Sequence, residues 1–163
     1  MKDFTIIDKT PIEYKTKKKI FDIKCREMIF KSNYNEKLSN EIIDAMRTVS
    51  KVFFGCDFNQ KISKLPKNVK TLKLWSSYKQ PLDNLPHSLR KLKIKGNFSS
   101  GFNLPLNNLP IGLEELHLPI SYNQTLTNLP ITMKKIVLPK NYTCDIPLIE
   151  TIFYYKFIFF FRK

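Results

Sequence analysis

The chain has 163 residues, of which 42% are apolar and 26% are charged, a balance that indicates one folded domain and excludes a disordered chain. Its formal net charge of +14 makes acidic partners the first class to consider: protein surfaces, nucleic acid or anionic lipid. A genome rich in A and T, which favours Lys, Asn and Ile codons, is the alternative source of this charge.

The first residues, "MKDFTIIDKTP", contain no apolar run of signal-peptide length. No segment reaches the roughly 20 apolar residues that a transmembrane helix needs, so we expect no transmembrane insertion. The three cysteines, Cys25, Cys56 and Cys144, form no C-x-x-C pair, and an odd number without close spacing suits a reducing compartment. We therefore expect a cytoplasmic protein that is not secreted.

Residues 1–24 precede the first repeat and are predicted to form an N-terminal cap, with "FTII" covering the end of the core. Residues 25–155 are predicted to form an array of about seven coils, each 20–24 residues long. The mark of each coil is an aromatic residue that recurs at steps of 20 or 24 residues. These residues are Tyr34, Phe58, Tyr78, Phe102, Tyr122 and Tyr142.

A triplet of apolar residues with the spacing L-x-x-L-x-L precedes each aromatic residue. Its last two members alternate with polar residues, as in "RKLKIK" (90–95), which is typical of a strand with one buried face. One such strand cannot bury its apolar side alone, whereas stacked copies build a continuous core. The pattern predicts a mainly β solenoid with one curved parallel sheet. The triplets begin at Cys25, Val49, Val69, Leu89, Leu113, Met133 and Ile149.

The segments between strands carry their own signals. Leu-Pro recurs where the chain must turn back, which suits a residue that cannot donate to a strand ladder. The Asn after most of the aromatic residues is predicted to form an internal ladder of hydrogen bonds, broken at Lys79 and Thr143. The stretch "SNEIIDAMRTVS" (39–50) lacks Leu-Pro, and Ser39 or Asn40 is expected to cap a helical turn there.

The chain ends in the aromatic stretch "FYYKFIFFFRK". Residues 156–163 are predicted to be an apolar C-terminal cap or tail of the array. The alternative is a contact with a membrane surface or with another copy of the chain, made by the same rings together with Arg162 and Lys163.

The quoted units "FNQKISKLPKNVKTLKL" (58–74), "FNLPLNNLPIGLEELHL" (102–118) and "YNQTLTNLPITMKKIVL" (122–138) resemble the FNIP repeat, a relative of leucine-rich repeats. The resemblance implies a leucine-rich-repeat-like fold and a role in protein–protein interaction, as an adaptor in some relatives. It also implies an origin in social amoebae or in the giant DNA viruses of amoebae, and host cytoplasm as the location if the protein is viral. Several giant-virus relatives carry an F-box ahead of the repeats, but residues 1–24 do not resemble one.

The strand positions that face away from the core predict a binding site on the concave side of the sheet. In the middle of that face, lysines surround the single Trp, with a histidine beside them. We hypothesise that this cluster binds an acidic protein segment with Trp75 as the anchor. Two alternatives stay open: the lysines only solvate the sheet, or the basic face binds nucleic acid or another polyanion. The residues are Lys51, Lys73, Trp75, Lys91, Lys93, Lys95 and His117.

The sequence contains no recognisable catalytic constellation. His87 and His117 fall in different coils and have no Asp or Cys partner at a recognised spacing. Glu114 and Glu115 are adjacent, so they point to opposite faces of a strand. The cysteines do not have metal-ligand spacing. We expect a non-enzymatic protein with no cofactor and no metal.

Overall fold

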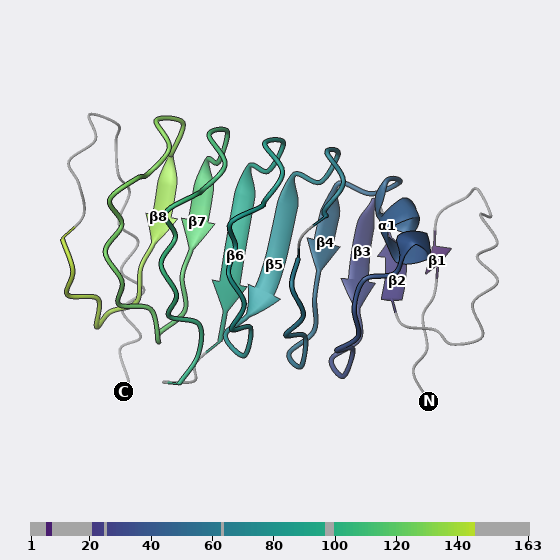
Figure 1. Cartoon of the computed structure of the whole chain (residues 1–163), viewed down its shortest axis with the longest axis horizontal. Coiled ribbons are helices and arrows are strands. Elements are labelled where there is room, and N and C mark those ends of the chain that lie inside the picture. The colour runs from purple at the N-terminus through teal and green to yellow at the C-terminus, as the bar shows by residue number, and fades with distance from the viewer. Residues whose placement is uncertain (1–5, 8–20, 25, 63, 97–99, 146–163) are drawn as a thin grey trace, which may run out of the picture.

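The computed structural model describes residues 6–7, 21–24, 26–62, 64–96 and 100–145. These residues form one eight-stranded sheet, in which the strands lie side by side in chain order, and one short helix (Figure 1). The elements are β1 (Ile6–Ile7), β2 (Phe21–Lys24), β3 (Glu27–Phe30), α1 (Asn40–Met46), β4 (Lys51–Phe53), β5 (Thr71–Trp75), β6 (Lys91–Lys95), β7 (Glu115–His117) and β8 (Lys135–Val137).

The strands β3 to β8 are parallel to one another, and the chain makes about five turns of a solenoid between the first and the last of them. The register is the one that the apolar triplets predict, because Leu72 lies opposite Leu92, which lies opposite Leu116. This confirms the predicted mainly β, leucine-rich-repeat-like solenoid. The last predicted triplet, which begins at Ile149, and the first residue of the first triplet, Cys25, lie outside the described residues.

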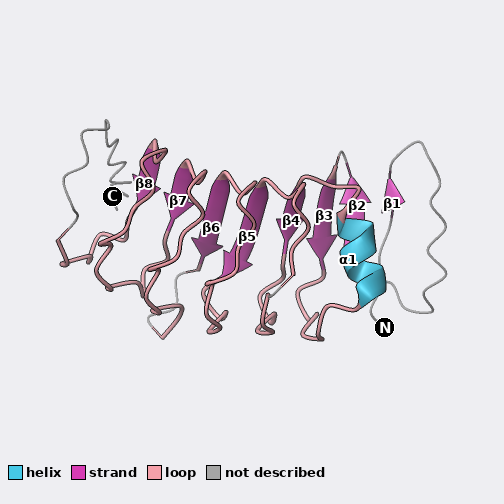
Figure 2. Cartoon of the chain, turned by 45° about the horizontal axis from the view of Figure 1, so that its top comes forward, coloured by secondary structure: helices cyan, strands magenta, loops and turns pink. Residues whose placement is uncertain are grey.

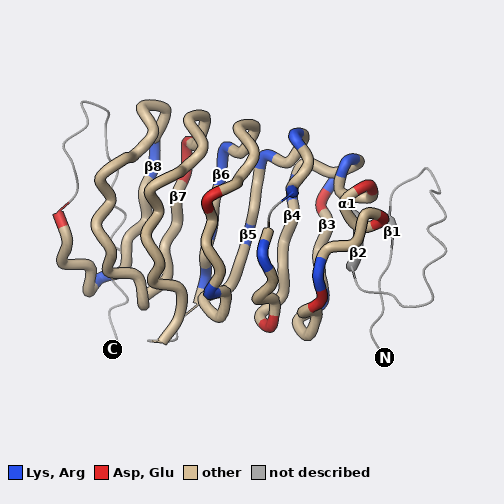
Figure 3. Tube along the Cα trace, in the orientation of Figure 1, with Lys and Arg blue, Asp and Glu red and all other residues tan. Residues whose placement is uncertain are grey.

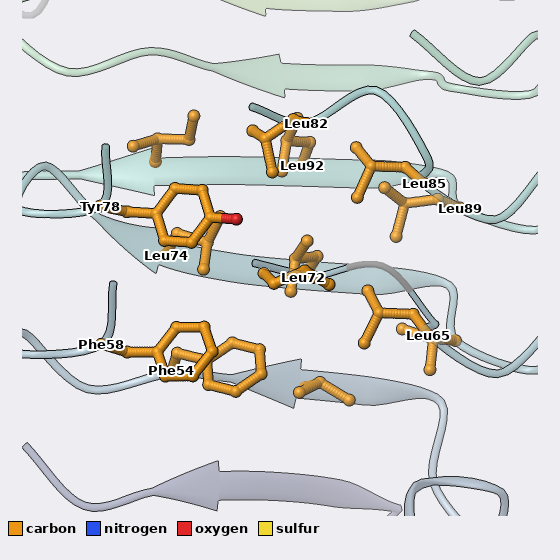
Figure 4. Packing of buried hydrophobic residues seen from close by; sticks show 14 of the residues in the cluster. Phe54, Phe58, Leu65, Leu72, Leu74, Tyr78, Leu82, Leu85, Leu89 and Leu92 are labelled. Carbon is orange, nitrogen blue, oxygen red and sulfur yellow. The ribbon is translucent and has the colours of Figure 1, made fainter. Parts of the chain in front are cut away.

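Each coil has two layers, a strand and a return segment that runs back across it (Figure 2). The core lies between them: strand residues such as Leu72 and Leu92 meet return-segment residues such as Leu65 and Leu85, and all of these are buried (Figure 4). Burying such a side chain contributes about 1.5–3 kcal/mol relative to leaving it exposed.

Two tight turns join the layers and explain two recurrent features of the sequence. At the four Leu-Pro pairs where the chain turns back towards a strand, the proline carbonyl accepts a hydrogen bond from the backbone N–H three residues on, for example from Leu89 to Pro86 at 2.9 Å. After β3, β4, β5, β7 and β8, the N–H of the aromatic residue donates to the carbonyl three residues before it, as from Tyr78 to Trp75 at 3.0 Å. Both turns satisfy backbone groups where the ladder ends.

The repeated aromatic residues form one continuous column inside the return side of the core. Neighbouring rings stack with centroid distances of 5.9, 6.1, 6.4, 6.1 and 6.3 Å along the chain, and interplanar angles of 26° or less. Such ring pairs contribute about 0.5–1.5 kcal/mol each beyond their buried area. The column therefore stabilises the contact between every pair of successive coils. Its members are Tyr34, Phe58, Tyr78, Phe102, Tyr122 and Tyr142.

The predicted asparagine ladder is present, and each step runs from a side chain to the next coil. The Oδ1 atom of Asn35 accepts from the N–H of Asn59 at 2.8 Å, and Asn59 accepts from Lys79 at 2.7 Å. The ladder restarts between Asn103 and Asn123 at 2.8 Å. The backbone N–H of Lys79 donates a ladder bond to Asn59, but Lys79 has no side-chain oxygen that could accept the next one. The break predicted at Lys79 is confirmed for the described residues.

The first coil returns through α1 instead of an extended segment. Ser39 has extended backbone and its Oγ accepts from the N–H of Ile42 at 3.3 Å, so Ser39 is the N-cap that the sequence suggested. Ile42, Ala45 and Met46 face the core and are buried. This coil has 24 residues instead of 20, and the additional length accommodates the helix.

The N-terminal edge of the sheet differs from the rest. β2 pairs antiparallel with β3, and β1 pairs parallel with β2. Arg26, in the connection between β2 and β3, has φ 62°, the left-handed conformation typical of two-residue hairpins. These strands extend the sheet beyond the first coil. Most of the predicted N-terminal cap, residues 1–24, lies outside the described residues, so that cap stays a prediction. The predicted C-terminal cap, 156–163, lies outside the described residues.

Candidate functional site on the open face of the sheet

The predicted site residues lie on one face of the sheet. Within each strand from β3 to β8 the residues alternate between buried and solvent-accessible, and the accessible ones form three rows across the strands. We call this surface the open face. It includes all seven predicted site residues. Its residues are Glu27, Ile29, Lys51, Phe53, Thr71, Lys73, Trp75, Lys91, Lys93, Lys95, Glu115, His117, Lys135 and Val137.

Two of the seven predicted residues are neutralised by glutamates on neighbouring strands. The Nζ atom of Lys51 lies 2.6 Å from Oε1 of Glu27, and that of Lys91 lies 2.8 Å from Oε1 of Glu115. Parallel pairing in register places each glutamate directly opposite its lysine. These two lysines contribute less to binding an external anion than the sequence suggested.

Lys73 lies between two aromatic rings at the centre of the open face. Its Nζ is 5.4 Å from the ring centroid of Phe53 and 5.8 Å from that of Trp75, within the range of cation–π attraction. Burial lowers the pKa of Lys73, and the charge of Lys95 lowers it further. The ammonium group is thus held in place and partly dehydrated before any partner arrives.

Lys93 is the most crowded of the basic residues. Burial lowers its pKa, and the charges of Lys91, Lys95 and Lys135 add to that effect, while Glu115 acts in the opposite direction. A bound carboxylate would relieve this repulsion. Among the residues that the structure describes, no carboxylate pairs with Lys73, Lys93 or Lys95.

The apolar part of the site lies beside the basic part, towards the N-terminal end of the array. Trp75 is 36% exposed and Ile29 is 41% exposed. Ile29 lies opposite Phe53 in the register, and Phe53 lies opposite Lys73. Ile29 and Phe53 are not among the seven site residues predicted from the sequence. Their apolar character at outward strand positions was the available signal.

His117 is held as a neutral imidazole on the open face. Burial lowers its pKa to about 4, and the charges of Lys93 and Lys135 act in the same direction. Glu115 opposes them, with its Oε2 3.5 Å from Nε2 of His117. At that distance the contact is at most a weak hydrogen bond. At neutral pH His117 therefore adds no charge to the site.

The depressed pKa of His117 predicts a loss of stability in mild acid. Between pH 6.5 and about 4 the unfolded chain protonates this histidine and the folded chain does not, so the unfolded state binds more protons. We expect the free energy of unfolding to fall across that window by on the order of 3 kcal/mol through this residue. Urea unfolding at a series of pH values measures the effect.

The variant His117→Gln isolates this contribution from that of the carboxylates. Burial raises the pKa of Glu115, but Lys91, Lys93 and His117 lower it overall, so its own contribution is lost at lower pH than that of His117. The pH dependence should be shallower in His117→Gln than in the native protein, and unchanged in His87→Gln, which replaces an exposed turn residue. Equal slopes in all three proteins would contradict the burial of His117.

Three further properties of the described residues bear on the kind of site this is. No group of three or more His, Cys, Asp or Glu side chains is placed to hold a metal ion within the described part of the chain. Cys56 and Cys144 are free thiols. No helix within the described ranges is long and apolar enough to cross a membrane.

Comparison with known proteins agrees with the geometry. Residues 58–96 match the family model of the FNIP Repeat. A comparison with curated protein sequences gave no match. Among solved structures, the chain is similar to CroV588, described as a novel circular LRR protein, with a TM-score of 0.66 and 25% sequence identity. The match covers 77% of this chain, which spans only 19% of the length of that protein.

The fold and its open face thus define a solenoid repeat protein of the leucine-rich-repeat kind. More particularly, the FNIP match over residues 58–96 together with the structural match supports an FNIP- or leucine-rich-repeat-like array, as the repeated units suggested. Solenoids of this class are typically interaction modules without enzymatic activity.

Proposed function

We propose that the protein is a non-enzymatic interaction module that binds an acidic segment of another protein on the open face. The observation that carries this proposal is the arrangement at the centre of that face. Three lysines, Lys73, Lys93 and Lys95, have no described carboxylate partner and lie next to Trp75, a large exposed aromatic residue. Aromatic anchors bordered by charges that a partner must neutralise are typical of binding hot spots.

The chemistry expected of the partner follows from the apolar part and the basic part of the open face, which lie side by side. An apolar or aromatic side chain of the partner would pack against Ile29, Phe53 and Trp75, and carboxylates would pair with Lys73, Lys93 and Lys95. Glu27 and Glu115 already neutralise Lys51 and Lys91. A short run of acidic residues in the partner is therefore enough to neutralise the three remaining lysines. An adaptor role in the cytoplasm, where free thiols such as Cys56 persist, completes the proposal.

Nucleic acid is less well supported than an acidic protein segment. Single-stranded binding needs several exposed rings on which bases stack. Tyr78 and Phe102, which are close to the lysines in sequence, are 0% exposed because they belong to the aromatic column. Among the described residues, this leaves Trp75 and the half-buried Phe53 as the stacking surfaces of the basic region.

The test compares the native protein with Trp75→Ala/Lys93→Glu as baits in a cell lysate. A matched control, Ile131→Ala/Lys140→Glu, removes one exposed apolar residue and reverses one exposed lysine away from the open face. The affinity for a captured protein should fall at least about 30-fold in the first variant, since loss of a hot spot costs about 2 kcal/mol or more. The control should bind like the native protein.

A direct readout uses the single Trp of the chain. Titration of the native protein with an acidic peptide from the captured partner should change the fluorescence of Trp75, with a midpoint equal to the dissociation constant. Equal capture by both variants would overturn the assignment of the open face. Capture that nuclease treatment abolishes would replace the protein partner with nucleic acid.

A further inference from the structure

A recess lies on the return side of the molecule, away from the open face. Its volume is about 590 Å³, within the range of roughly 300–1,000 Å³ that is common for small-molecule sites. Residues from the return segments of the first three coils line it, among them the exposed Lys37, Lys61 and Lys64 and the half-buried Asn59, Gln60 and Gln80, which we call its floor. We call it the return-side recess.

The recess exists because the first coil differs from its neighbours. That coil returns through α1, whereas the next two return through extended segments (Figures 1 and 2). A helix is about 10 Å wide with its side chains, so it stands out from the layer that the extended segments form. The step beside α1 leaves the side chains of Leu38 and Ile43 half-buried along one wall.

Among the described residues, every charged side chain that lines the recess is a lysine. Lysines follow one another on the neighbouring return segments in front of β3 and β4 (Figure 3). Within the described part of the chain, no Asp or Glu side chain lines the recess. Lys37, Lys61 and Lys64 form no ion pair with any carboxylate that the structure describes, in contrast to Lys51 and Lys91 on the open face.

The amide side chains in the floor are oriented by the coil-to-coil ladder. Oδ1 of Asn59 accepts from the N–H of Lys79 at 2.7 Å and from Nε2 of Gln80 at 3.4 Å. The Nδ2 donor of Asn59 has no hydrogen-bond partner among the described residues and is available to a ligand. Gln60 is fixed through its Nε2, which lies 3.1 Å from the backbone oxygen of Asn35. The floor is therefore preorganised without any ligand.

We propose that the return-side recess binds a small organic anion that carries two or more phosphoryl groups. The three lysine ammonium groups neutralise the phosphoryl oxygens, as lysines do at phosphate sites. Asn59 donates a hydrogen bond through Nδ2, and the organic part of the ligand packs on Leu38 and Ile43. This site is independent of the open face, and neither proposal requires the other.

The experiment uses the full-length chain labelled with ¹⁵N and two probes, ATP without metal and inorganic tripolyphosphate, in a buffer of physiological ionic strength. The backbone amide signals of Asn59, Gln60 and Lys61 should shift on addition of ATP, and those of β5 and β6 should not. ATP should bind more tightly than tripolyphosphate, because only ATP has an organic part that reaches the apolar wall.

Two variants with the same loss of charge distinguish a site from general attraction to a basic protein. Lys61→Gln/Lys64→Gln should weaken ATP binding about tenfold or more, since two charge-assisted contacts are lost. Lys93→Gln/Lys95→Gln, on the open face, should leave it unchanged. Equal weakening by both variants, shifts spread over both faces, or no binding at millimolar ATP would overturn the proposal. Equal affinity for ATP and tripolyphosphate would overturn the claim that the organic part of the ligand packs on Leu38 and Ile43.

Discussion

Replacement of Phe58 by Ala is expected to lower the free energy of unfolding by about 3–5 kcal/mol, the usual cost of removing a buried aromatic side chain. Phe58 is 1% exposed, and its ring stacks on Phe54 at 3.9 Å, on Tyr34 at 5.9 Å and on Tyr78 at 6.1 Å. The substitution leaves a cavity in the aromatic column that rigid neighbouring coils cannot fill. Urea unfolding followed by circular dichroism measures the loss.

The position of Phe58 near one end of the array makes the effect uneven. A solenoid is stabilised by contacts between neighbouring coils, so the coils next to the cavity lose more than distant ones. Hydrogen exchange in Phe58→Ala should accelerate more in β3 and β4 than in β7 and β8. Ile111→Ala, at a residue that is 69% exposed, is the control and should change stability by less than about 0.5 kcal/mol. Uniform acceleration along the array would contradict coil-by-coil stabilisation.

Replacement of Gly55 by Ala is expected to cost about 1–3 kcal/mol or more, the range for overpacking a rigid site. A Cβ atom at this position would meet the backbone of the preceding coil, at the carbonyl oxygen of Lys31 and 2.5 Å from Cα of Ser32. Backbone atoms cannot move aside as a flexible side chain does, so the stacking of the first two coils must shift. Thermal and urea unfolding of Gly55→Ala measure the cost.

Gly112→Ala provides the matched comparison. A Cβ atom there would meet the guanidinium group of Arg90, which is the end of a flexible side chain. Arg90 would give up its hydrogen bonds to the carbonyls of His87 and Gly112, both at 3.0 Å, and move into solvent. We expect Gly112→Ala to be clearly less destabilising than Gly55→Ala. The opposite order would show that the first two coils are less closely packed than described.

The two-layer construction separates the residues that stabilise the fold from those available for binding. Leu72 and Leu74 of β5 are fully buried, whereas Lys73 and Trp75 of the same strand lie on the open face. The same division holds in β6. Substitutions on the open face should therefore alter binding at little cost in stability, which makes the variant Trp75→Ala/Lys93→Glu suitable for the binding test.

Much of this fold could be predicted from the sequence because a solenoid is built from local rules. The spacing of Leu89, Leu92 and Ile94 sets which side of the strand is buried, and each coil repeats it. A slip of one residue would turn the apolar side chains outward, so the register between strands follows from the same pattern. A helix cap at Ser39 or Asn40 was predictable because capping depends on a side chain and its nearest backbone. The ladder break at Lys79 was predictable because the repeat places the same position of successive coils side by side.

The amino-acid sequence alone thus determined the coil, its register and the set of side chains on the open face. Only the tertiary structure decided which of those side chains are available. Glu27 neutralises Lys51 and Glu115 neutralises Lys91, because residues 24 positions apart in each pair lie directly opposite one another. The low pKa of His117 likewise arises from burial. The return-side recess arises from the width of α1. Both depend on the stacking of neighbouring coils, which no single repeat contains.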